Sequence, residues 1–407
     1  MSDTDTTPDV SAEGPDSACP DQVGIVTSRS WLENLRDSLI GSVIGIMLVV
    51  AAVVLLSWNE GTELTALHTL DLAERLVVEA PSARIDPILE GRLVHLTGTL
   101  AAASPARDPL FGVIAADAVR LERRVEMFQW EEHVSSSTQK SLGGGSTTQT
   151  TYDYQKAWSD RAIDSGPFHA RAGHVNPSLP LSDVTSNAAD VRLGPYRLDA
   201  AVLDRLTPSA PLGLPEGAAL APGWQRGEAG PYRGRDPAQP AIGDLRVTFR
   251  ATLAGTASII AGQQGAGQQG DRLAAFATPD GRIVALAADG VVSAAAMLGA
   301  KRSSARILAW TLRLTGFLLC LGGLVLMARP LAVLVSVVPV LETVVDVTAT
   351  LAMAGLAALV TLATIAVARI VLQPLLSMGL LAAGAAIAWV CLRLRRPGAA
   401  PPTGMPV

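Results

Sequence analysis

Charged side chains are scarce in this sequence. Asp, Glu, Lys and Arg together make up 17% of the 407 residues, whereas an ordinary soluble domain carries about 25%. Hydrophobic residues make up 49%, and the formal net charge of −5 lacks the basic excess that is typical of a nucleic-acid-binding protein. The composition therefore favours a membrane protein over a wholly soluble enzyme, and it argues against nucleic acid as a partner.

Cysteine is also rare, with three residues in the chain: Cys19, Cys320 and Cys391. Cys19 lies in an acidic N-terminal tail, and the other two lie in long apolar runs. The large region at 59–306 therefore contains no cysteine. This excludes a disulfide framework, a zinc ribbon and a cysteine nucleophile from that region.

Local signatures of catalysis are missing as well. The sequence has no G-x-S-x-G elbow, no H-E-x-x-H motif and no P-loop. Gly265, Gly267 and Gly270 match G-x-G-x-x-G, but they belong to the tandem AGQQGAGQQG, and Asp280–Gly281 leaves no room for a crossover helix. We therefore interpret this match as a low-complexity loop and predict no nucleotide cofactor.

The five histidines do not form a zinc motif. His169 and His174 are five residues apart, and a metal site would have to recruit Glu131, Glu132 or His133. We predict ordinary surface or hydrogen-bonded histidines, with no metal, no cofactor and no catalytic residue. The chain is therefore predicted not to be an enzyme.

Long hydrophobic runs are what the sequence has instead. A bilayer core of about 30 Å needs about 20 apolar residues in a helix. Four runs reach that length: 39–58, 307–328, 348–368 and 370–391. The second run contains one charge, Arg313, which we expect to snorkel or to pair within the bundle.

The predicted fold class is a membrane protein of the α+β type, with four transmembrane helices and a large β-rich extracytoplasmic domain, 59–306, inserted between helices 1 and 2. The tail at 1–38 is acidic and predicted to be disordered. The segment at 331–347 is predicted to be interfacial or re-entrant, and 392–407 to be a basic and then disordered tail. Four spans put both termini on one side, which the excess of Lys and Arg there predicts to be the cytoplasm.

The soluble domain is predicted to be mostly β structure. Alternating residues predict a hairpin of 119–132 with 150–160, and 243–253 is expected to pair with 257–262. Two further strands are expected at 91–102 and 282–288, and helices are expected at 62–79, 198–206 and 291–306.

Five aromatic residues mark the predicted hairpin: Phe128, Trp130, Tyr152, Tyr154 and Trp158. Within each strand they are two or four residues apart, so each set lies on one face. One interpretation is a contact face for a partner or the membrane surface. The alternative, which we favour, is that a bulge turns them inward or that the proline-rich loop at 207–240 covers them.

Small residues mark the first span. Gly41 and Gly45 form a G-x-x-x-G motif, a spacing that lets two helices approach closely. We predict that these glycines mediate helix association and self-association of the chain.

Six short motifs resemble the transmembrane protein 43 family, also called LUMA, in order and spacing. They are SWNEG at 57–61, EGRLVHLTGTL at 90–100, RRVEMFQWEE at 123–132, YDYQKAWSD at 152–160, GHVNPS at 173–178 and GDLRVTF at 243–249. The resemblance implies a four-span protein with a lumenal domain, which in animals lies in the endoplasmic reticulum and inner nuclear membrane. It also implies self-association and the organisation of envelope complexes with lamins and emerin, without established catalytic residues.

These observations predict a non-enzymatic membrane scaffold that self-associates, with membrane lipids, a second copy and other membrane proteins as partners. An extracytoplasmic ligand sensor or accessory subunit is the alternative, and a membrane hydrolase is a third reading. No N-x-S/T sequon is present, and the chain is rich in alanine. Both features favour a bacterial inner membrane and a periplasmic domain.

Overall fold

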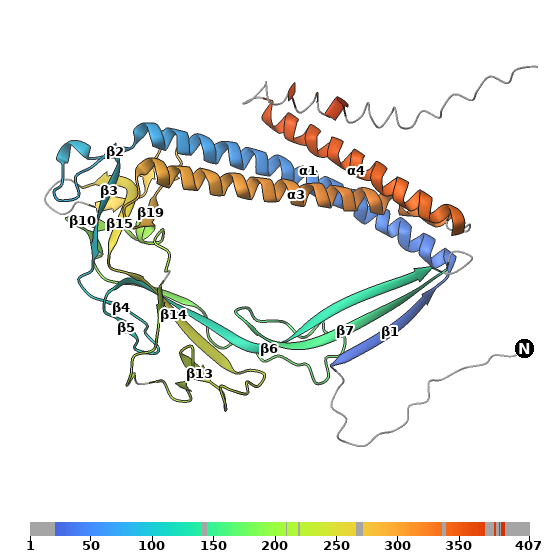
Figure 1. Cartoon of the computed structure of the whole chain (residues 1–407), viewed down its shortest axis with the longest axis horizontal. Helices are drawn as coiled ribbons and strands as arrows, with labels where there is room; N and C mark the ends of the chain where they lie inside the picture. Colours follow the sequence, from blue (N-terminus) through green and yellow to red (C-terminus); the bar gives the residue numbers. More distant parts are fainter. Residues whose placement is uncertain are drawn as a thin grey trace, which may run out of the picture.

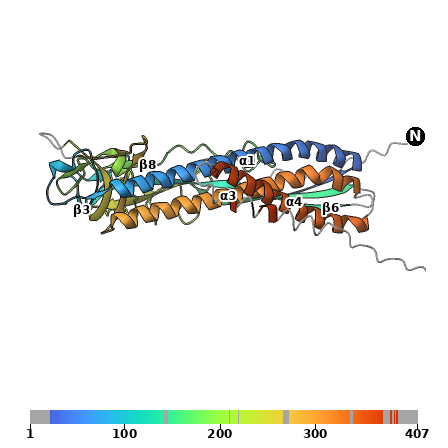
Figure 2. The same ribbon diagram turned by 90° about the horizontal axis from the view of Figure 1, so that it is seen from above.

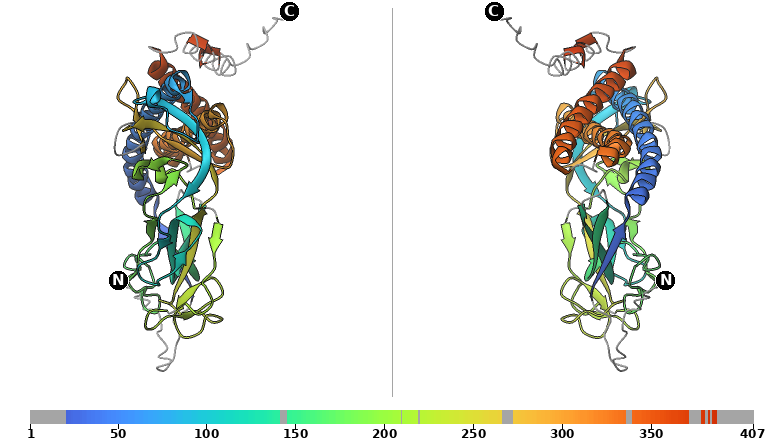
Figure 3. Two further views of the ribbon diagram at one scale, coloured as in Figure 1. Left: turned by 90° about the vertical axis from the view of Figure 1, so that its left-hand side faces the viewer. Right: turned by 90° about the vertical axis from the view of Figure 1, so that its right-hand side faces the viewer.

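The computed structural model describes residues 21–370, except 141–144, 209, 219, 266–271 and 336–338, together with residues 378, 379, 382 and 384–386. Long helices form one layer of the molecule, and β structure lies along one side of it (Figure 1). A view along the molecule shows the same division, with helices gathered at one side and strands at the other (Figure 3).

Within the described residues, three helices are long and apolar enough to cross a membrane: α1 (Trp31–Leu76), α3 (Ala294–Val335) and α4 (Pro339–Arg369). They contain the first three predicted spans. The fourth predicted span, 370–391, lies mostly outside the described residues. The segment predicted to be interfacial or re-entrant, 331–347, is divided between the end of α3 and the start of α4. Its place relative to a membrane stays a prediction.

α1 and α3 lie side by side as a long antiparallel pair (Figure 2). A capping box of Ser30 and Glu33 begins α1. The buried residues of α1 recur at spacings of seven, which is the heptad pattern of a coiled-coil seam. One set is Ser38, Gly45, Ala52 and Asn59, and the other is Leu56, Glu63 and Leu70. At 46 residues, α1 is about 69 Å long, and so extends well beyond a bilayer core of about 30 Å.

The β structure consists mainly of two sheets. The 8-stranded sheet contains, in spatial order, β1 (Gln22–Arg29), β7 (Ser146–Ser159), β6 (Ala118–Lys140), β14 (Leu245–Leu253), β13 (Pro231–Arg233) and β12 (Gln225–Arg226), with β8 (Val184–Asn187) beside β6 and β11 (Ala210–Leu212) beside β14. The 7-stranded sheet contains β19 (Leu286–Asp289), β15 (Thr256–Gln264), β16 (Arg272–Ala274), β10 (Tyr196–Leu198), β9 (Arg192–Leu193), β3 (Leu93–Ala101) and β2 (Val78–Glu79). Smaller elements are η1 (Pro87–Leu89), α2 (Ala200–Leu203) and the pairs β4 (Ala106–Arg107) with β5 (Ile114–Ala115) and β17 (Phe276–Ala277) with β18 (Ile283–Val284).

The second sheet lies between the first sheet and the helices. Ile259 of β15 belongs to the core shared with β6 and β14, whereas Ile260, its neighbour, packs against Leu70 of α1 and Leu298 of α3. Because both faces of β15 are covered, seven consecutive residues from Ala257 onward are buried. This sheet therefore joins the β domain to one end of the helix pair.

The predicted hairpin is confirmed and is longer than expected. β6 and β7 pair from Met127–Ser159 to Lys140–Ser146, so both strands continue through Ser- and Thr-rich sequence at 135–140 and 146–151. The other predicted pair, 243–253 with 257–262, is wrong. β14 pairs with β6, while β15 pairs with β3. The short link between β14 and β15 thus carries the chain from one sheet to the other, which strand patterning does not distinguish from a hairpin.

The N-terminal tail differs most from expectation. Residues 1–38 were predicted to be disordered, but Gln22–Arg29 form β1 and α1 begins at Trp31. β1 pairs along its whole length with β7, from Gln22–Asp153 to Arg29–Ser146. The structure thus places the tail beside a strand of the domain at 59–306. The side of a bilayer on which each of them lies stays a prediction.

Candidate functional site

A cluster of four charged side chains, three of them buried and Arg313 partly buried, lies where α1, α3 and α4 meet. Glu60 and Glu63 come from α1, Arg313 from α3 and Arg369 from the last turn of α4. Glu60 is 0% exposed, and Glu63 and Arg369 are also buried. The cluster is thus contributed by three helices that are distant in sequence.

Each arginine contacts both carboxylates. Arg313 donates from Nε to Glu60 Oε1 at 2.6 Å and from a terminal nitrogen to Glu60 Oε2 at 3.0 Å, and it also donates to Glu63. Arg369 donates to Glu60 and to Glu63. The two acids and two bases balance in charge, and this balance compensates for the cost of removing them from water.

Neighbouring groups complete the surroundings of the cluster. Asn59, which is buried, donates to the carbonyl oxygen of Ala309 at 3.2 Å and so links α1 to α3 one residue before Glu60. The guanidinium of Arg313 lies 5.0 Å from the ring centroid of Trp310, within the range of a cation–π contact. Asn59 and Glu60 belong to the SWNEG motif, so the structure assigns this motif to helix packing.

The sequence identified only one member of this cluster. Arg313 was expected to snorkel or to pair within the bundle, and the structure shows that it pairs. Glu60 and Glu63 follow the first apolar run by a few residues, and Arg369 follows the third. A heptad register for α1 would have placed Asn59 and Glu63 on the seam and thereby pointed to partners for Arg313.

A second cluster brings three of the sequence motifs together on the β6–β7 hairpin. His174 stacks on Tyr154 at a centroid distance of 3.9 Å and meets Trp130 edge-on at 4.6 Å. Asn176 accepts from the backbone N–H of Trp130 at 2.7 Å and donates to its carbonyl oxygen at 2.9 Å. The amide of Asn176 thus pairs with β6 as a neighbouring strand would. The hydroxyl of Tyr154 donates a hydrogen bond to the carboxylate of Glu132 at 2.6 Å.

The five predicted aromatic residues are therefore packed against other side chains. Trp130 and Tyr154 are buried. Tyr152 stacks on His169 at 4.3 Å, and Phe128 lies 5.2 Å from Trp158. Residues 161–178 supply most of the cover, and the proline-rich segment at 207–240 contributes Tyr232, which meets Trp158 edge-on at a centroid distance of 6.2 Å. The sequence composition did not reveal this cover, because residues 161–178 are held to the hairpin by a few single side chains such as Asn176 and Glu132.

The acid and histidine candidates for a metal site have other partners. His169 donates its backbone N–H to Glu132 at 2.7 Å, and the ring of His174 bonds to the carbonyl oxygen of Ala170 at 2.8 Å. His133 lies 3.7 Å from Glu131. Among the residues that the structure describes, no group of three His, Cys, Asp or Glu side chains is arranged to hold a metal ion. Residues 266–271 of the glycine-rich match lie outside the described residues.

The predicted association glycines lie at the crossing of α1 and α3. A Cβ at Gly45 would lie 2.5 Å from the carbonyl oxygen of Gly323, and one at Gly323 would lie 2.6 Å from that of Gly45. A Cβ at Gly41 would meet only Leu326, at 3.9 Å. The contact of Gly45 is thus made within the chain, so this residue is not free for a second copy.

Comparison with known proteins gives consistent matches. A family model described as transmembrane protein 43 matches residues 127–374. The chain is 31% identical over 319 residues to transmembrane protein 43 of Rattus norvegicus, which covers 75% of this chain and 78% of the relative. The protein of Homo sapiens is 31% identical over 322 residues with the same coverage. The homolog of Drosophila melanogaster is 31% identical over 304 residues, covering 72% and 78%. No solved structure matches.

Proposed function

Because the chain belongs to the transmembrane protein 43 family, we propose that it is a non-enzymatic integral membrane scaffold that self-associates and organises membrane protein complexes. The observation that carries this proposal is the charge cluster. Both carboxylates and both guanidinium groups bond to one another, and three helices are held at one point. Charges used in this way fix the arrangement of helices, which supports a structural role for the cluster.

The outer face of α1 supports the self-association part of the proposal. Val43, Met47, Val50 and Val54 lie opposite the α3 seam, and each is more than half exposed. Their spacings of four, three and four residues repeat the heptad pattern that α1 uses toward α3. A second α1 helix is the occupant that this spacing fits.

A cysteine-crosslinking experiment tests self-association through this face. The three native cysteines are replaced by serine, and single cysteines are introduced at Val43, Met47, Val50 or Val54 of the full-length protein in membranes. We expect disulfide-linked dimers for at least one of these positions. Leu56, which is 0% exposed in the seam with α3, is the matched control and is expected to give monomers.

Light scattering in mild detergent gives an independent measure of the same property. The proposal predicts a discrete oligomer together with the crosslinks. A monomer in detergent, combined with no crosslink at any of the four positions, would show that the face contacts lipid and would overturn self-association. A bacterial inner membrane is the proposed location, on the sequence features given above.

A further inference from the structure

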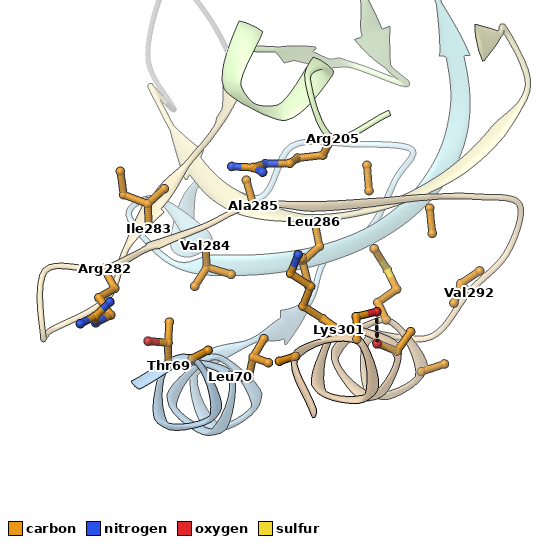
Figure 4. A pocket seen from close by; sticks show the side chains of 18 of the residues that line it. Thr69, Leu70, Arg205, Arg282, Ile283, Val284, Ala285, Leu286, Val292 and Lys301 are labelled. Atoms are coloured by element: carbon orange, nitrogen blue, oxygen red, sulfur yellow. Dashed lines mark hydrogen bonds between the residues drawn. The ribbon is translucent and has the colours of Figure 1, made fainter. Parts of the chain in front are cut away.

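A pocket of about 760 Å³ lies where the helix pair meets the second sheet. Its floor is formed by α1 and α3, and its wall by the chain from Gly281 to Ala288, which includes β18 and β19 (Figure 4). Leu70, Val284, Leu286 and Met297 give it an apolar lining. The pocket is separate from the charge cluster and from the hairpin cluster, because it shares no lining residue with either.

The charged residues that line this pocket are all positive. Arg205, Arg282 and Lys301 line it, and its lining contains no Asp, Glu or His. Figure 4 shows Arg205 and Lys301 approaching from opposite sides, with the apolar wall between them. In the described part of the chain, Arg205 and Lys301 have no ion-pair partner, and Arg282 has only Asp280 at 3.9 Å. The neighbouring Arg302 differs, since Asp71 and Glu74 already neutralise it.

The pocket also lies beside the membrane-facing part of α3. Its lining extends along α3 to Ser304 and Ala305. The apolar run begins two residues later at Ile307, which is 67% exposed, and continues with Leu308 and Trp310, which are exposed as well. An acyl chain in the pocket would therefore remain next to the surface that contacts the bilayer.

We propose that this pocket binds an anionic glycerophospholipid of the surrounding membrane. The acyl chain lies between Leu286 of the wall and Met297 of the floor, and the anionic headgroup lies among the cations that line the pocket, Lys301, Arg205 and Arg282. A phospholipid fits better than a fatty acid, because its phosphate, ester and glycerol oxygens extend over a wider span than one carboxylate, whereas Arg205 and Lys301 lie on opposite sides of the wall. This inference does not depend on the scaffold role, since a monomer has the complete pocket.

Lipid retention by the full-length protein tests the proposal. The protein is placed in nanodiscs of phosphatidylcholine with a minor share of phosphatidylglycerol, transferred to mild detergent and examined by native mass spectrometry. We expect phosphatidylglycerol to be retained in preference to phosphatidylcholine. Lys301→Gln and Arg205→Gln should each lower this preference about fivefold, as expected for the loss of one cation near an anionic headgroup. The double variant should lower it further.

Two control variants separate site binding from general charge. Arg306→Gln removes an exposed cation of α3 that does not line the pocket, and Lys301→Arg keeps the charge. Both are expected to retain phosphatidylglycerol as the wild type does. If Arg306→Gln has the same effect as Lys301→Gln, the lipid is held by net charge and the proposal is wrong.

A volume variant tests the acyl chain separately. Ala300→Leu adds bulk to the lining while it leaves all three cations in place. It should lower phosphatidylglycerol retention, and unchanged retention would show that only a surface headgroup is bound. In a parallel arm, oleate is added. If oleate binds in a Lys301-dependent way and phosphatidylglycerol does not, the ligand is a free fatty acid and the phospholipid assignment is overturned.

Discussion

Single charged residues determine how the three helices meet. Glu60 accepts from both Arg313 and Arg369, so removing this carboxylate leaves two guanidinium groups with one acid. Breaking a buried ion pair costs far more than breaking an exposed one, because the remaining charge loses its compensation. The charge cluster is therefore where a single substitution should have the largest effect on helix packing.

We predict that Glu60→Gln lowers the free energy of unfolding by about 3 kcal/mol, the lower end for a broken buried pair. Thermal unfolding of the detergent-solubilised protein, followed by tryptophan fluorescence, measures this effect. Glu74→Gln is the matched control, since Glu74 pairs with Arg302 at the exposed surface of α1, where loss of a pair costs about 0.5 kcal/mol. Equal effects of the two substitutions would refute the structural role of the cluster.

Tyr154 gives a second residue-level prediction. Its hydroxyl donates to Glu132 and accepts from the backbone N–H of Ala170, so Tyr154→Phe should cost about 1–2 kcal/mol of unfolding free energy. Tyr152→Phe is the control, because Tyr152 contacts its neighbour through its ring. A comparable loss in both variants would show that the hydroxyl of Tyr154 contributes nothing specific.

The same hydroxyl makes the hairpin sensitive to alkaline pH. Burial, and then the hydrogen bond to Glu132, raise the pKa of Tyr154. The folded chain thus holds this proton more tightly than the unfolded chain, and the stabilisation is complete below the ordinary tyrosine pKa of about 10. It should be lost as the pH rises through the raised value. Unfolding experiments across this range should show a steeper alkaline decline for the wild type than for Tyr154→Phe.

At the level of elements, the local sequence pattern predicted where helices and strands lie better than it predicted which strands pair. The first three apolar runs, β3 and the β6–β7 hairpin follow from composition and alternation, which are properties of short segments. The partners of β14 and β15, the cover at 161–178 and the charge cluster depend on contacts between residues far apart in the chain. For example, Glu60 meets Arg369 across 309 positions, and no spacing rule connects them.

The crossing of α1 and α3 gives a prediction at this scale. Gly323→Ala places a methyl group 2.6 Å from the carbonyl oxygen of Gly45, so the helices must separate. Overpacking of this kind costs about 1–3 kcal/mol. The adjacent Gly322 has no neighbour within 4 Å of an added Cβ, and Gly322→Ala should be neutral or stabilising by up to about 1 kcal/mol. Matching melting temperatures for the two variants would contradict the close crossing.

At the level of the whole molecule, β structure contacts both ends of α1. The second sheet packs on Leu70 and Ala73, while at the other end Asn34 accepts from the hydroxyl of Ser146 at 3.0 Å. The tips of β6 and β7 and the end of β1 lie beside the start of α1 (Figure 1). The pairing of β1 (Gln22–Arg29) with β7 can therefore be used to test on which side of the membrane the N-terminal strand lies.

We predict that Val26→Cys and Gln149→Cys form a disulfide in a chain without native cysteines. These residues are directly opposite in the β1–β7 register, where Cα atoms are about 4.5–5.5 Å apart and within disulfide range. Val26→Cys with Thr147→Cys, two positions out of register, should crosslink much less. Failure of the first pair in membranes, with the protein otherwise folded, would place the two strands in different compartments.

The β1–β7 pairing also has a consequence for synthesis. Arg29 pairs with Ser146, 117 residues later, so at about 5–20 residues per second the first strand waits roughly 6–23 s for its partner. The apolar run of α1 at 39–58 is synthesised within that interval, so it becomes available to the insertion machinery before Ser146 has been made. We therefore expect a change in elongation rate between these two segments to alter the fraction of molecules that complete the sheet.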